Sequence, residues 1–442
     1  MDYAFLGQRG TNDWTDSDFR PKDWRETVLY LYPNGDAPLT ALTATMKSER
    51  ATDPEFYWFT KGLPKQGGAV TGVYTDVLTT PYAGGGVATD TLYIKIAADV
   101  VQHFRNGHQV LLRDASDPTV DVVGKVTAEP VTNGASSYIT VTLLEDDDNS
   151  SLGDLQDCDA VLIIGNINSE GAGMPKAISY DPVKYYSKTQ IWRTPLDITR
   201  TARKTKLRTY DQYKEAKREA LQLHAMELEK SYFWSIMTET VGSNGKPERT
   251  TKGLIPWIRE SAADGATVSD YTQDDAYGIE AGNGGKTWLE AGEAWLDVVC
   301  EHIFRHGSDE RLAYVGSGVL LAINKLIKAN TSSRFQFNEK TGAYGIKVTE
   351  WHTPFGIVYM KRHPLFSYDD TTRNMAVVFD PKDLVYKYID DTTFFPSGEG
   401  KVSSAGDRID GTKEEYLTEA GLEFHHPAKC ALLTGFGSDN AA

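Results

Sequence analysis

The clearest periodic pattern in the chain lies between Thr209 and Met237, where apolar positions recur every three or four residues. The recurring positions are Tyr210, Tyr213, Leu221, His224, Leu228, Tyr232 and Ile236. No Pro or Gly interrupts this segment, and Thr209 with Gln212 fits an S/T-x-x-E/Q capping box. The spacing predicts one helix over 210–237, about 42 Å long, which needs a partner surface along its whole length.

A different pattern, with period two, fills the region between Leu92 and Ile164. Short runs rich in β-branched residues are separated by the turn signals Asn106-Gly107, Asp117-Pro118 and Asn133-Gly134. The runs are 92–101, 109–113, 119–128, 137–144 and 160–164. Five such strands in about 75 residues predict a small β-barrel or sandwich.

The flanks of this β-rich region indicate that it is an insertion. Glycines gather on either side of it, at 84–86 and 171–173. The segments 56–63 and 185–199 read as the two arms of a longer hairpin that would carry the insertion. Residues 65–90, rich in Gly and Thr, are expected to be extended and exposed.

The rest of the chain, after Gly242, mixes both periods and has no internal repeat. Helices are expected at 288–306 and 319–328. Strands are expected at 312–315, 346–351, 356–361, 375–379, 384–389 and 422–436. The whole pattern predicts an α+β fold.

The first 50 residues show no clean period. Trp14, Phe19, Trp24, Tyr30 and Tyr32 are scattered among charged residues. Such a segment cannot form its own core, so it lies along another surface. That surface belongs either to its own domain or to a neighbouring subunit, and the pattern leaves both open.

Composition narrows the class of protein. With 46 Lys and Arg against 62 Asp and Glu, the net charge is −16, which argues against a nucleic-acid binder that neutralises phosphates. An apolar fraction of 40% excludes wholesale disorder. Three cysteines form no disulfide or zinc framework.

No apolar run approaches the ~20 residues of a membrane helix, and the start resembles no signal peptide, so we expect a soluble, intracellular chain without a membrane partner.

Three motifs that could carry chemistry are each incomplete. The run GNGGKT at 282–287 is similar to a phosphate-binding loop, but Glu280 stands where Gly is required and no buried strand precedes it. Ser317 follows a predicted strand without the GxSxG pattern, and is better interpreted as a helix N-cap. His302 and His306 share a helix face without a third ligand. We therefore predict no catalytic residue, no metal site and no cofactor, and expect no enzyme.

Two charged clusters of opposite sign stand out. The acidic one, Glu145, Asp146, Asp147 and Asp148, is followed by further acids and lacks the spacing of a calcium loop, so a solvated loop is favoured. The basic one is Arg200, Arg203, Lys204, Lys206 and Arg208. It could bind nucleic acid or an acidic patch on another subunit, for which the acidic loop would be suitable.

The order of these elements, with three particular stretches, resembles a known family. The stretches are PLTALTATMKSERATDPEFYWFTKGLP, EGAGMPKAISYDPVKYYSKTQIWRTPLDITRTARKTKL and YLTEAGLEFHHPAKCALLTGF. They resemble the major capsid proteins of tailed bacteriophages with the Hong Kong 97-like fold, in the group with an insertion domain in the extended loop.

The resemblance implies roles by region. Residues 1–50 would be the N-terminal arm, and 51–199 the extended loop hairpin with an inserted β-barrel at 87–170. The peripheral domain would comprise 200–264 and 346–395, with the spine helix at 210–237. The axial domain would comprise 265–345 and 396–442.

The resemblance also implies a function and partners. The chain would be a coat protein that self-assembles into hexamers and pentamers of an icosahedral shell around double-stranded DNA, contacted without sequence specificity. Trp14 and Trp24 would anchor in neighbouring subunits, and the basic cluster would pair with an acidic surface such as the 145–148 loop. Scaffold, portal and cement proteins are possible partners, and the protein would lie in the virion after assembly in the host cytoplasm.

Three other functions stay open on the sequence. The chain could be another phage structural component, such as a tail or decoration protein. Its 48 aromatic residues and many carboxylates could line the sugar groove of a carbohydrate-active enzyme. A nucleotide-dependent motor would need the incomplete 282–287 loop to bind phosphate.

Overall fold

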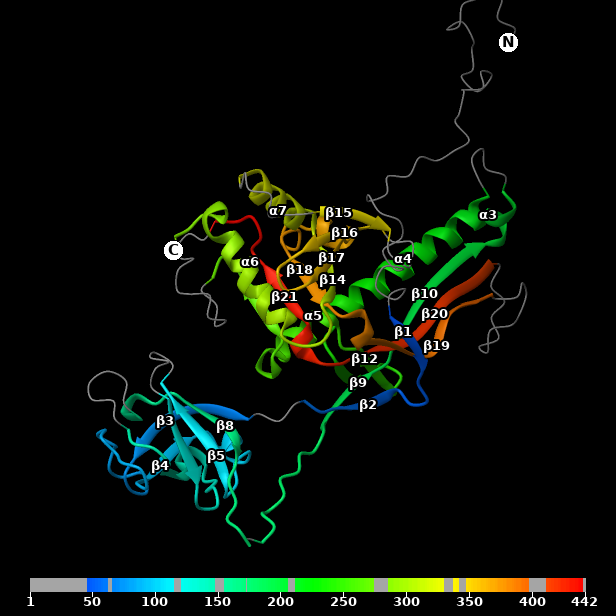
Figure 1. The fold of residues 1–442 in the computed structure, drawn as a ribbon. Coiled ribbons are helices and arrows are strands. Elements are labelled where there is room, and N and C mark those ends of the chain that lie inside the picture. The colour runs from blue at the N-terminus through cyan, green and yellow to red at the C-terminus, as the bar shows by residue number, and fades with distance from the viewer. Residues whose placement is uncertain are drawn as a thin grey trace, which may run out of the picture. The chain divides into compact units, whose positions relative to one another are not determined.

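The computed structural model describes residues 46–62, 66–114, 121–147, 155–171, 173–205, 211–273, 285–329, 337–341, 347–396 and 411–439. The chain forms two compact units (Figure 1). The smaller unit comprises Phe59–Val183, and the larger one comprises the residues up to Trp58 and from Lys184 onwards. Among the described residues, no helix is long and apolar enough to cross a membrane.

The smaller unit is a closed barrel with strand order β3-β4-β7-β6-β5-β8. Its strands are β3 (Gly67–Tyr74), β4 (Thr91–Ile96), β5 (His108–Arg113), β6 (Asp121–Val126), β7 (Tyr138–Leu143) and β8 (Ala160–Asn166). Alternate side chains point inward, as the period of two requires, so Ile94, Val110 and Ile139 are fully buried. The short helix α2 (Ala98–Val101) packs against this core.

The barrel begins earlier than the sequence pattern indicated. Strand β3 lies in the segment that we expected to be extended and exposed, so the barrel starts at Gly67 rather than at 87. A Cβ at Gly67 would lie 2.5 Å from the Val161 carbonyl oxygen, and one at Gly68 would lie 2.5 Å from a Val100 methyl. Glycine at these two positions permits close packing, although a Gly-rich stretch of sequence is typical of a loop. The run 92–101 also bends from strand β4 into α2.

The larger unit contains a long sheet with strand order β1-β19-β20-β10. These strands are β1 (Lys47–Arg50), β19 (Leu384–Phe395), β20 (Gly411–Phe424) and β10 (Gln190–Thr199). Strand β1 runs parallel to β19, and the other pairs are antiparallel. The short helix α3 (Arg200–Lys204) follows β10 directly.

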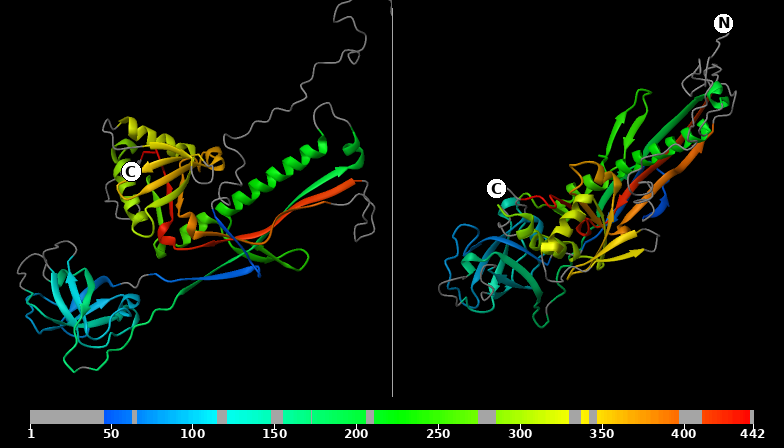
Figure 2. Two further views of the ribbon diagram at one scale, coloured as in Figure 1. Left: turned by 45° about the vertical axis from the view of Figure 1, so that its right-hand side comes forward. Right: turned by 90° about the horizontal axis from the view of Figure 1, so that it is seen from above.

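Helix α4 (Gln212–Trp234) lies alongside β10 and β20 in each view (Figures 1 and 2). It is the long helix that the periodic pattern predicted, but it is shorter than 210–237. Its N-cap is Asp211, whose carboxylate accepts a hydrogen bond from the Tyr213 amide at 3.1 Å. Thr209, the expected cap, lies outside the described residues. Beyond Trp234 the chain enters a hairpin of β11 (Thr238–Val241) and β12 (Pro247–Thr250).

Two further strands, β2 (Glu55–Thr60) and β9 (Val183–Lys188), pair into the two-stranded ribbon that joins the units. They agree with the predicted arm 56–63 and with the start of the predicted arm 185–199, whose remainder is β10 of the long sheet because it pairs with β20. At the base of the ribbon, Lys188 forms ion pairs with Glu55 at 3.6 Å and with Glu239 of β11.

A second sheet has strand order β13-β21-β18-β14-β17-β16-β15. Its strands are β13 (Thr267–Asp270), β21 (Ala431–Thr434), β18 (Ala376–Phe379), β14 (Glu310–Val315), β17 (Ile357–Arg362), β16 (Lys347–His352) and β15 (Phe337–Thr341). Helices α6 (Trp288–Phe304) and α7 (Ser317–Ala329) pack on one face of this sheet. Helices α5 (Leu254–Glu260) and α8 (Pro364–Tyr368) pack on the other face with the end of α4.

The two sheets divide the chain differently from the expected domain ranges. Strands β16, β17 and β18 were assigned with the spine helix, yet they belong to the sheet of β14. Strand β20 was assigned with 396–442, yet it lies between β19 and β10 beneath α4. The physical reason is pairing: β14 bonds to β17 on one side and to β18 on the other, and β18 is buried along its whole length.

Candidate intersubunit surfaces

The spine helix α4 is locked to the long sheet through a buried histidine. His224 has no solvent exposure, and its two ring nitrogens lie 2.9 Å from Thr194 Oγ1 and 2.8 Å from Thr418 Oγ1. Burial lowers the pKa of His224, so the ring is neutral and one nitrogen donates while the other accepts. Thr418 Oγ1 continues the chain to Thr392 at 2.9 Å, so α4, β10, β20 and β19 share one polar connection.

A second buried pair ties α4 to the other sheet. Glu229 Oε1 lies 2.7 Å from His363 Nε2, and neither side chain is exposed. His363 also packs edge-on against Phe233 of α4. The helix is therefore held at both sheets, which makes the larger unit a stiff support for whatever its surface binds.

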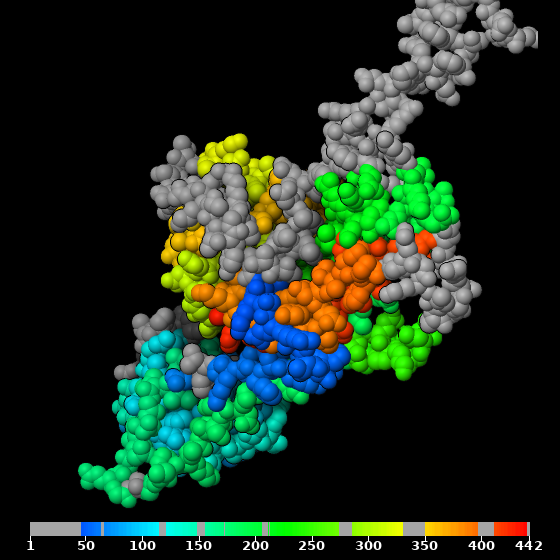
Figure 3. All heavy atoms as spheres, turned by 90° about the vertical axis from the view of Figure 1, so that its right-hand side faces the viewer, coloured from blue at the N-terminus to red at the C-terminus, as the bar shows by residue number. Residues whose placement is uncertain are grey.

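The base of the N-terminal segment is fixed by ion pairs. Lys387 Nζ of β19 lies 2.5 Å from Glu49 Oε2 of β1 and 3.1 Å from Glu423 Oε2 of β20. Hydrogen bonding to Lys387, and then to Lys47, lowers the pKa of Glu49 to about 2. Figure 3 shows β1, in blue, lying against β19, in orange. Trp14 and Trp24, the predicted anchors, lie outside the described residues.

The basic cluster is only partly described. Arg200, Arg203 and Lys204 are exposed on α3, whose N-cap Thr199 accepts a hydrogen bond from the Ala202 amide at 3.2 Å. The Arg203 guanidinium lies 4.8 Å from the centre of the Tyr213 ring and donates to Thr412 Oγ1 at 3.4 Å. Lys206 and Arg208 lie outside the described residues. The structure thus brings three of the five cations together at the end of β10.

The acidic loop is only partly the solvated loop that we expected: Glu145 and Asp146 are exposed, whereas Asp147 is buried. Glu145 accepts a hydrogen bond from the Val123 amide, and Asp146 accepts one from the Ala88 amide at 2.6 Å. Asp147 is 3% exposed and accepts a hydrogen bond from the Tyr82 hydroxyl at 2.6 Å. These carboxylates satisfy polar groups of the barrel itself. Asp148 lies outside the described residues.

The motifs considered for chemistry serve the ends of helices. Thr287 caps α6 in a capping box with Glu290, while Gly282 lies outside the described residues. Ser317 is the first residue of α7 rather than its N-cap, and its amide donates to Ser367 Oγ at 3.2 Å. Over the described ranges, no group of three or more His, Cys, Asp or Glu side chains could hold a metal ion.

An aromatic surface on the β2–β9 ribbon is absent from the sequence predictions. Tyr57 and Tyr186 are each about half exposed, and their ring centres lie 6.0 Å apart. Lys184 Nζ lies 3.7 Å from the centre of the Tyr57 ring. The alternation of inward and outward positions along 56–63 and 185–199 could have revealed this surface, because only one face of a two-stranded ribbon can pack against the rest of the protein. Exposed aromatics in such a patch are typical of protein–protein contact surfaces.

Comparison with known proteins gives a consistent result. A family model described as SU10 major capsid protein matches residues 9–437. The chain is 24% identical over 433 residues to a major capsid protein of Pseudomonas phage PaMx41, a match that covers 94% of this chain and 92% of that one.

Two solved capsid structures are also similar over nearly the whole chain. One is the capsid of a native GTA particle, at 8% identity and a TM-score of 0.44, covering 98% of each chain. The other is from Mycobacterium phage Bobi, at 9% identity and a TM-score of 0.42, covering 96% of this chain and 97% of that one.

Proposed function

The chain belongs to the SU10 major capsid protein family, and we propose that it assembles as hexamers and pentamers into an icosahedral shell around double-stranded DNA. It is a structural coat protein of a phage, and its place is the capsid of the virion. The family match over residues 9–437 is the observation that carries this function. Among the functions left open by the sequence, family membership favours the coat protein over a tail or decoration component.

The proposed assembly uses surfaces that a single copy leaves uncovered. The aromatic face of the β2–β9 ribbon and the N-terminal segment leaving β1 would lie on neighbouring copies, with Trp14 and Trp24 as anchors. Distributed contacts of this kind bury area that a compact monomer cannot bury alone. The stiff connection of α4 to both sheets supports this role, because a shell transmits load through its subunits.

The packaged DNA would face an acidic chain. A net charge of −16 disfavours tight adhesion of phosphates to the wall, so contact with DNA would be non-specific and weak. We place assembly in the host cytoplasm, with scaffold, portal and cement proteins as further partners. The same proposal assigns the chain no catalytic step, no cofactor and no membrane partner.

The basic cluster is the proposed charged contact between copies. Arg200, Arg203 and Lys204 are exposed on α3, with Lys206 and Arg208 following in sequence. An acidic surface of a neighbouring copy would neutralise them. Asp147 is unsuitable as a partner because it is buried and bonded to Tyr82, so the matching surface would use other carboxylates.

Charge reversal at α3 tests this assembly. We expect R203E/K204E to form about tenfold fewer closed particles than the wild type, as judged by negative-stain electron microscopy. The variant R203K/K204R keeps both charges and should assemble normally. Far-UV circular dichroism and thermal melting of both variants should match the wild type. Normal shells from the reversed variant would rule out the basic cluster as a contact, and failure of the wild type to assemble would count against the shell itself.

A further inference from the structure

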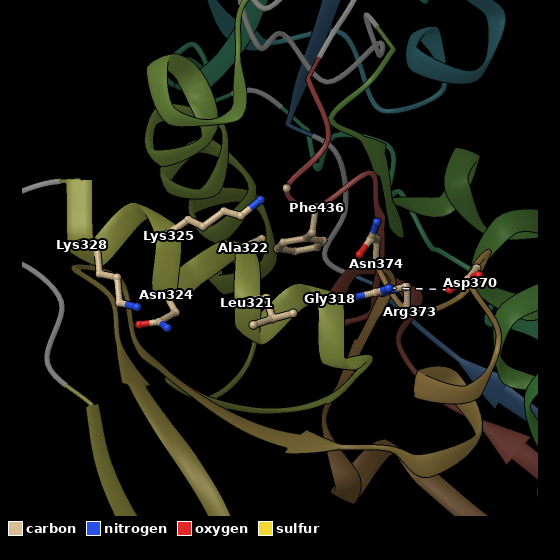
Figure 4. Close-up of a pocket in the computed structure, with 11 residues that line it drawn as sticks. Gly318, Leu321, Ala322, Asn324, Lys325, Lys328, Asp370, Arg373, Asn374 and Phe436 are labelled. Atoms are coloured by element: carbon tan, nitrogen blue, oxygen red, sulfur yellow. Dashed lines mark ion pairs between the residues drawn. The ribbon is translucent and has the colours of Figure 1, made fainter.

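A hollow of about 600 Å³ lies beside α7 in the larger unit (Figure 4). Its walls come from three segments far apart in sequence: α7, the turn that precedes β18, and the chain after β21. The volume is within the range of pockets that hold small ligands, roughly 300–1,000 Å³. No sequence motif pointed to it, because its residues meet only in the folded chain.

The walls of the hollow are held rigidly. The Gly318 amide donates to the Arg373 carbonyl at 2.9 Å, and a Cβ at Gly318 would lie 1.8 Å from Asn374 Oδ1. Beneath the hollow, the buried Trp288 indole donates to the Ala322 carbonyl at 3.0 Å. The site therefore exists before any ligand arrives, which lowers the entropic cost of binding.

Positive charge dominates the lining. Lys325 and Lys328 come from α7 and Arg373 from the turn before β18, and the single carboxylate among the lining residues is Asp370. Figure 4 shows Asp370 paired with Arg373, at 3.6 Å. Both lysines are exposed, and within the described residues neither has a carboxylate in ion-pair distance. The apolar floor is formed by Ala322 and the buried Phe436. A hollow with a positively charged rim and a small apolar floor is suited to bind a short acidic segment of a protein.

We propose that this hollow binds an acidic segment of a second copy of the chain, whose carboxylates pair with Lys325 and Lys328. The chain carries 62 Asp and Glu against 46 Lys and Arg, so every copy has carboxylates in excess. Double-stranded DNA fits less well, because its closely spaced phosphates need an extended basic strip rather than a concave site with two available lysines.

The proposed contact joins two different surfaces, the hollow of one copy and the segment of another that fills it. Repeated head-to-tail, the contact closes into a ring when the rotation permits; made reciprocally, it gives a two-fold pair. This inference rests on the self-assembly proposed above and adds to it one interface and its chemistry. It differs from the α3 cluster, which lies at the end of the long sheet.

Zero-length crosslinking tests the contact in assembled particles. Carbodiimide joins a lysine amine to a carboxylate only where the two groups come into direct contact. Particles assembled from mixed ¹⁴N and ¹⁵N chains separate contacts between copies from contacts within one copy. We expect mixed-isotope crosslinks from Lys325 or Lys328 to an Asp or Glu. The Lys387–Glu423 pair, 3.1 Å apart within one copy, shows that the reaction works. Crosslinks confined to one copy, such as Lys328 to Asp370, or no crosslink from either lysine, would overturn the proposal.

Charge reversal gives an independent readout. We expect K325E/K328E to lower the yield of closed particles about tenfold with unchanged circular dichroism, while K325R/K328R assembles as the wild type does. Binding to a short DNA duplex is measured in parallel. Normal assembly of K325E/K328E, with or without loss of DNA binding, would overturn the contact while leaving the coat-protein function intact. If the wild type itself forms no particles, the shell fails rather than this interface.

Discussion

The barrel and the long sheet deal with their strand edges in different ways. The barrel closes, so each of its strands has a neighbour on both sides, and its loop carboxylates bond to its own amides and to Tyr82. In the described part of the long sheet, β1 and β10 remain as edges. The outward positions of β10 are Ile191, Arg193, Pro195, Asp197 and Thr199. Proline and charges on an edge strand oppose the addition of another strand.

This difference indicates which surfaces of the chain neighbouring copies can bind. The barrel leaves no open strand edge to which a strand of another copy could pair. Among the described residues, the larger unit protects its β10 edge, while charges on α3, aromatics on the ribbon and the lysines of the hollow beside α7 are exposed to solvent. We therefore expect contacts between copies to run through side chains of the larger unit rather than through shared strands.

The largest effect is expected from Trp295→Ala, which breaks the larger unit alone. Trp295 is 1% exposed, packs against Phe436 with ring centres 5.2 Å apart, and donates to Ser269 Oγ at 2.8 Å. Truncation should cost about 3–5 kcal/mol of unfolding free energy. Calorimetry should show the transition of the larger unit at lower temperature and the barrel transition unchanged. A shift of both transitions would contradict independent units.

The matching change in the barrel is Ile94→Ala. Ile94 is fully buried in the barrel core, so the cavity should cost about 2–5 kcal/mol. Only the barrel transition should move in calorimetry, and shells should still form. If Ile94→Ala destabilised the larger unit equally, the two units would share one cooperative fold.

A smaller effect is expected from Tyr82→Phe, which tests the internal use of the acidic loop. The Tyr82 hydroxyl donates to Asp147 Oδ2 and accepts from the Gly86 amide, both at 2.6 Å. Its loss leaves a buried carboxylate and an amide short of a partner, at a cost of about 1–3 kcal/mol in urea unfolding. Tyr93→Phe is the control, because within the described residues the Tyr93 hydroxyl has no hydrogen bond. Equal effects from both variants would show that Asp147 does not depend on Tyr82.

The smallest effect concerns the edge strand β1 and its pH dependence. The folded pKa of Glu49, about 2, lies below its ordinary value of 4.5. The ion pair with Lys387 therefore stabilises β1 fully above pH 4.5, and this contribution is lost as the pH falls from 4.5 toward 2. The Ala51 amide donates to the Tyr388 carbonyl, so its hydrogen exchange reports on the pairing of β1 with β19. This exchange should speed up in that pH range, relative to the exchange of an amide with no titrating group nearby.

The variant Glu49→Gln should remove this pH dependence. Glu49 is partly exposed, so water screens the pair and the change in overall stability is small. Asp197→Asn, at an exposed position of β10, serves as the control and should leave the exchange of Ala51 as in the wild type. If the exchange of Ala51 still depends on pH in Glu49→Gln, a group other than Glu49 causes that dependence.

Much of the fold could be predicted from periodicity, and the failures have physical causes. Strands β4 to β8 and helix α4 follow clean periods, since one face of each is buried. Strand β3 was not predicted, because a stretch that contains Gly67 and Gly68 is typical of a loop. In the structure these glycines are required by the close packing of the barrel. The placement of β20 depends on pairing with β10, more than 200 residues earlier in the chain, and no local pattern carries that information.

The candidate surfaces were harder to predict than the fold. Charge alone found the cluster at Arg203 and Lys204 on α3. It could not show that Asp147 is buried, because its partner Tyr82 lies 65 residues away. The hollow beside α7 was missed for the same reason, since Lys325, Arg373 and Phe436 meet only through tertiary packing.

The most direct test of the central claim is to image the purified full-length chain by negative-stain electron microscopy, with light scattering on the same sample. We expect closed shells from the wild type and from R203K/K204R, and few or none from R203E/K204E. A wild-type chain that stays a compact monomer, with a radius of gyration of roughly 22 Å, would contradict a coat protein that assembles through these surfaces.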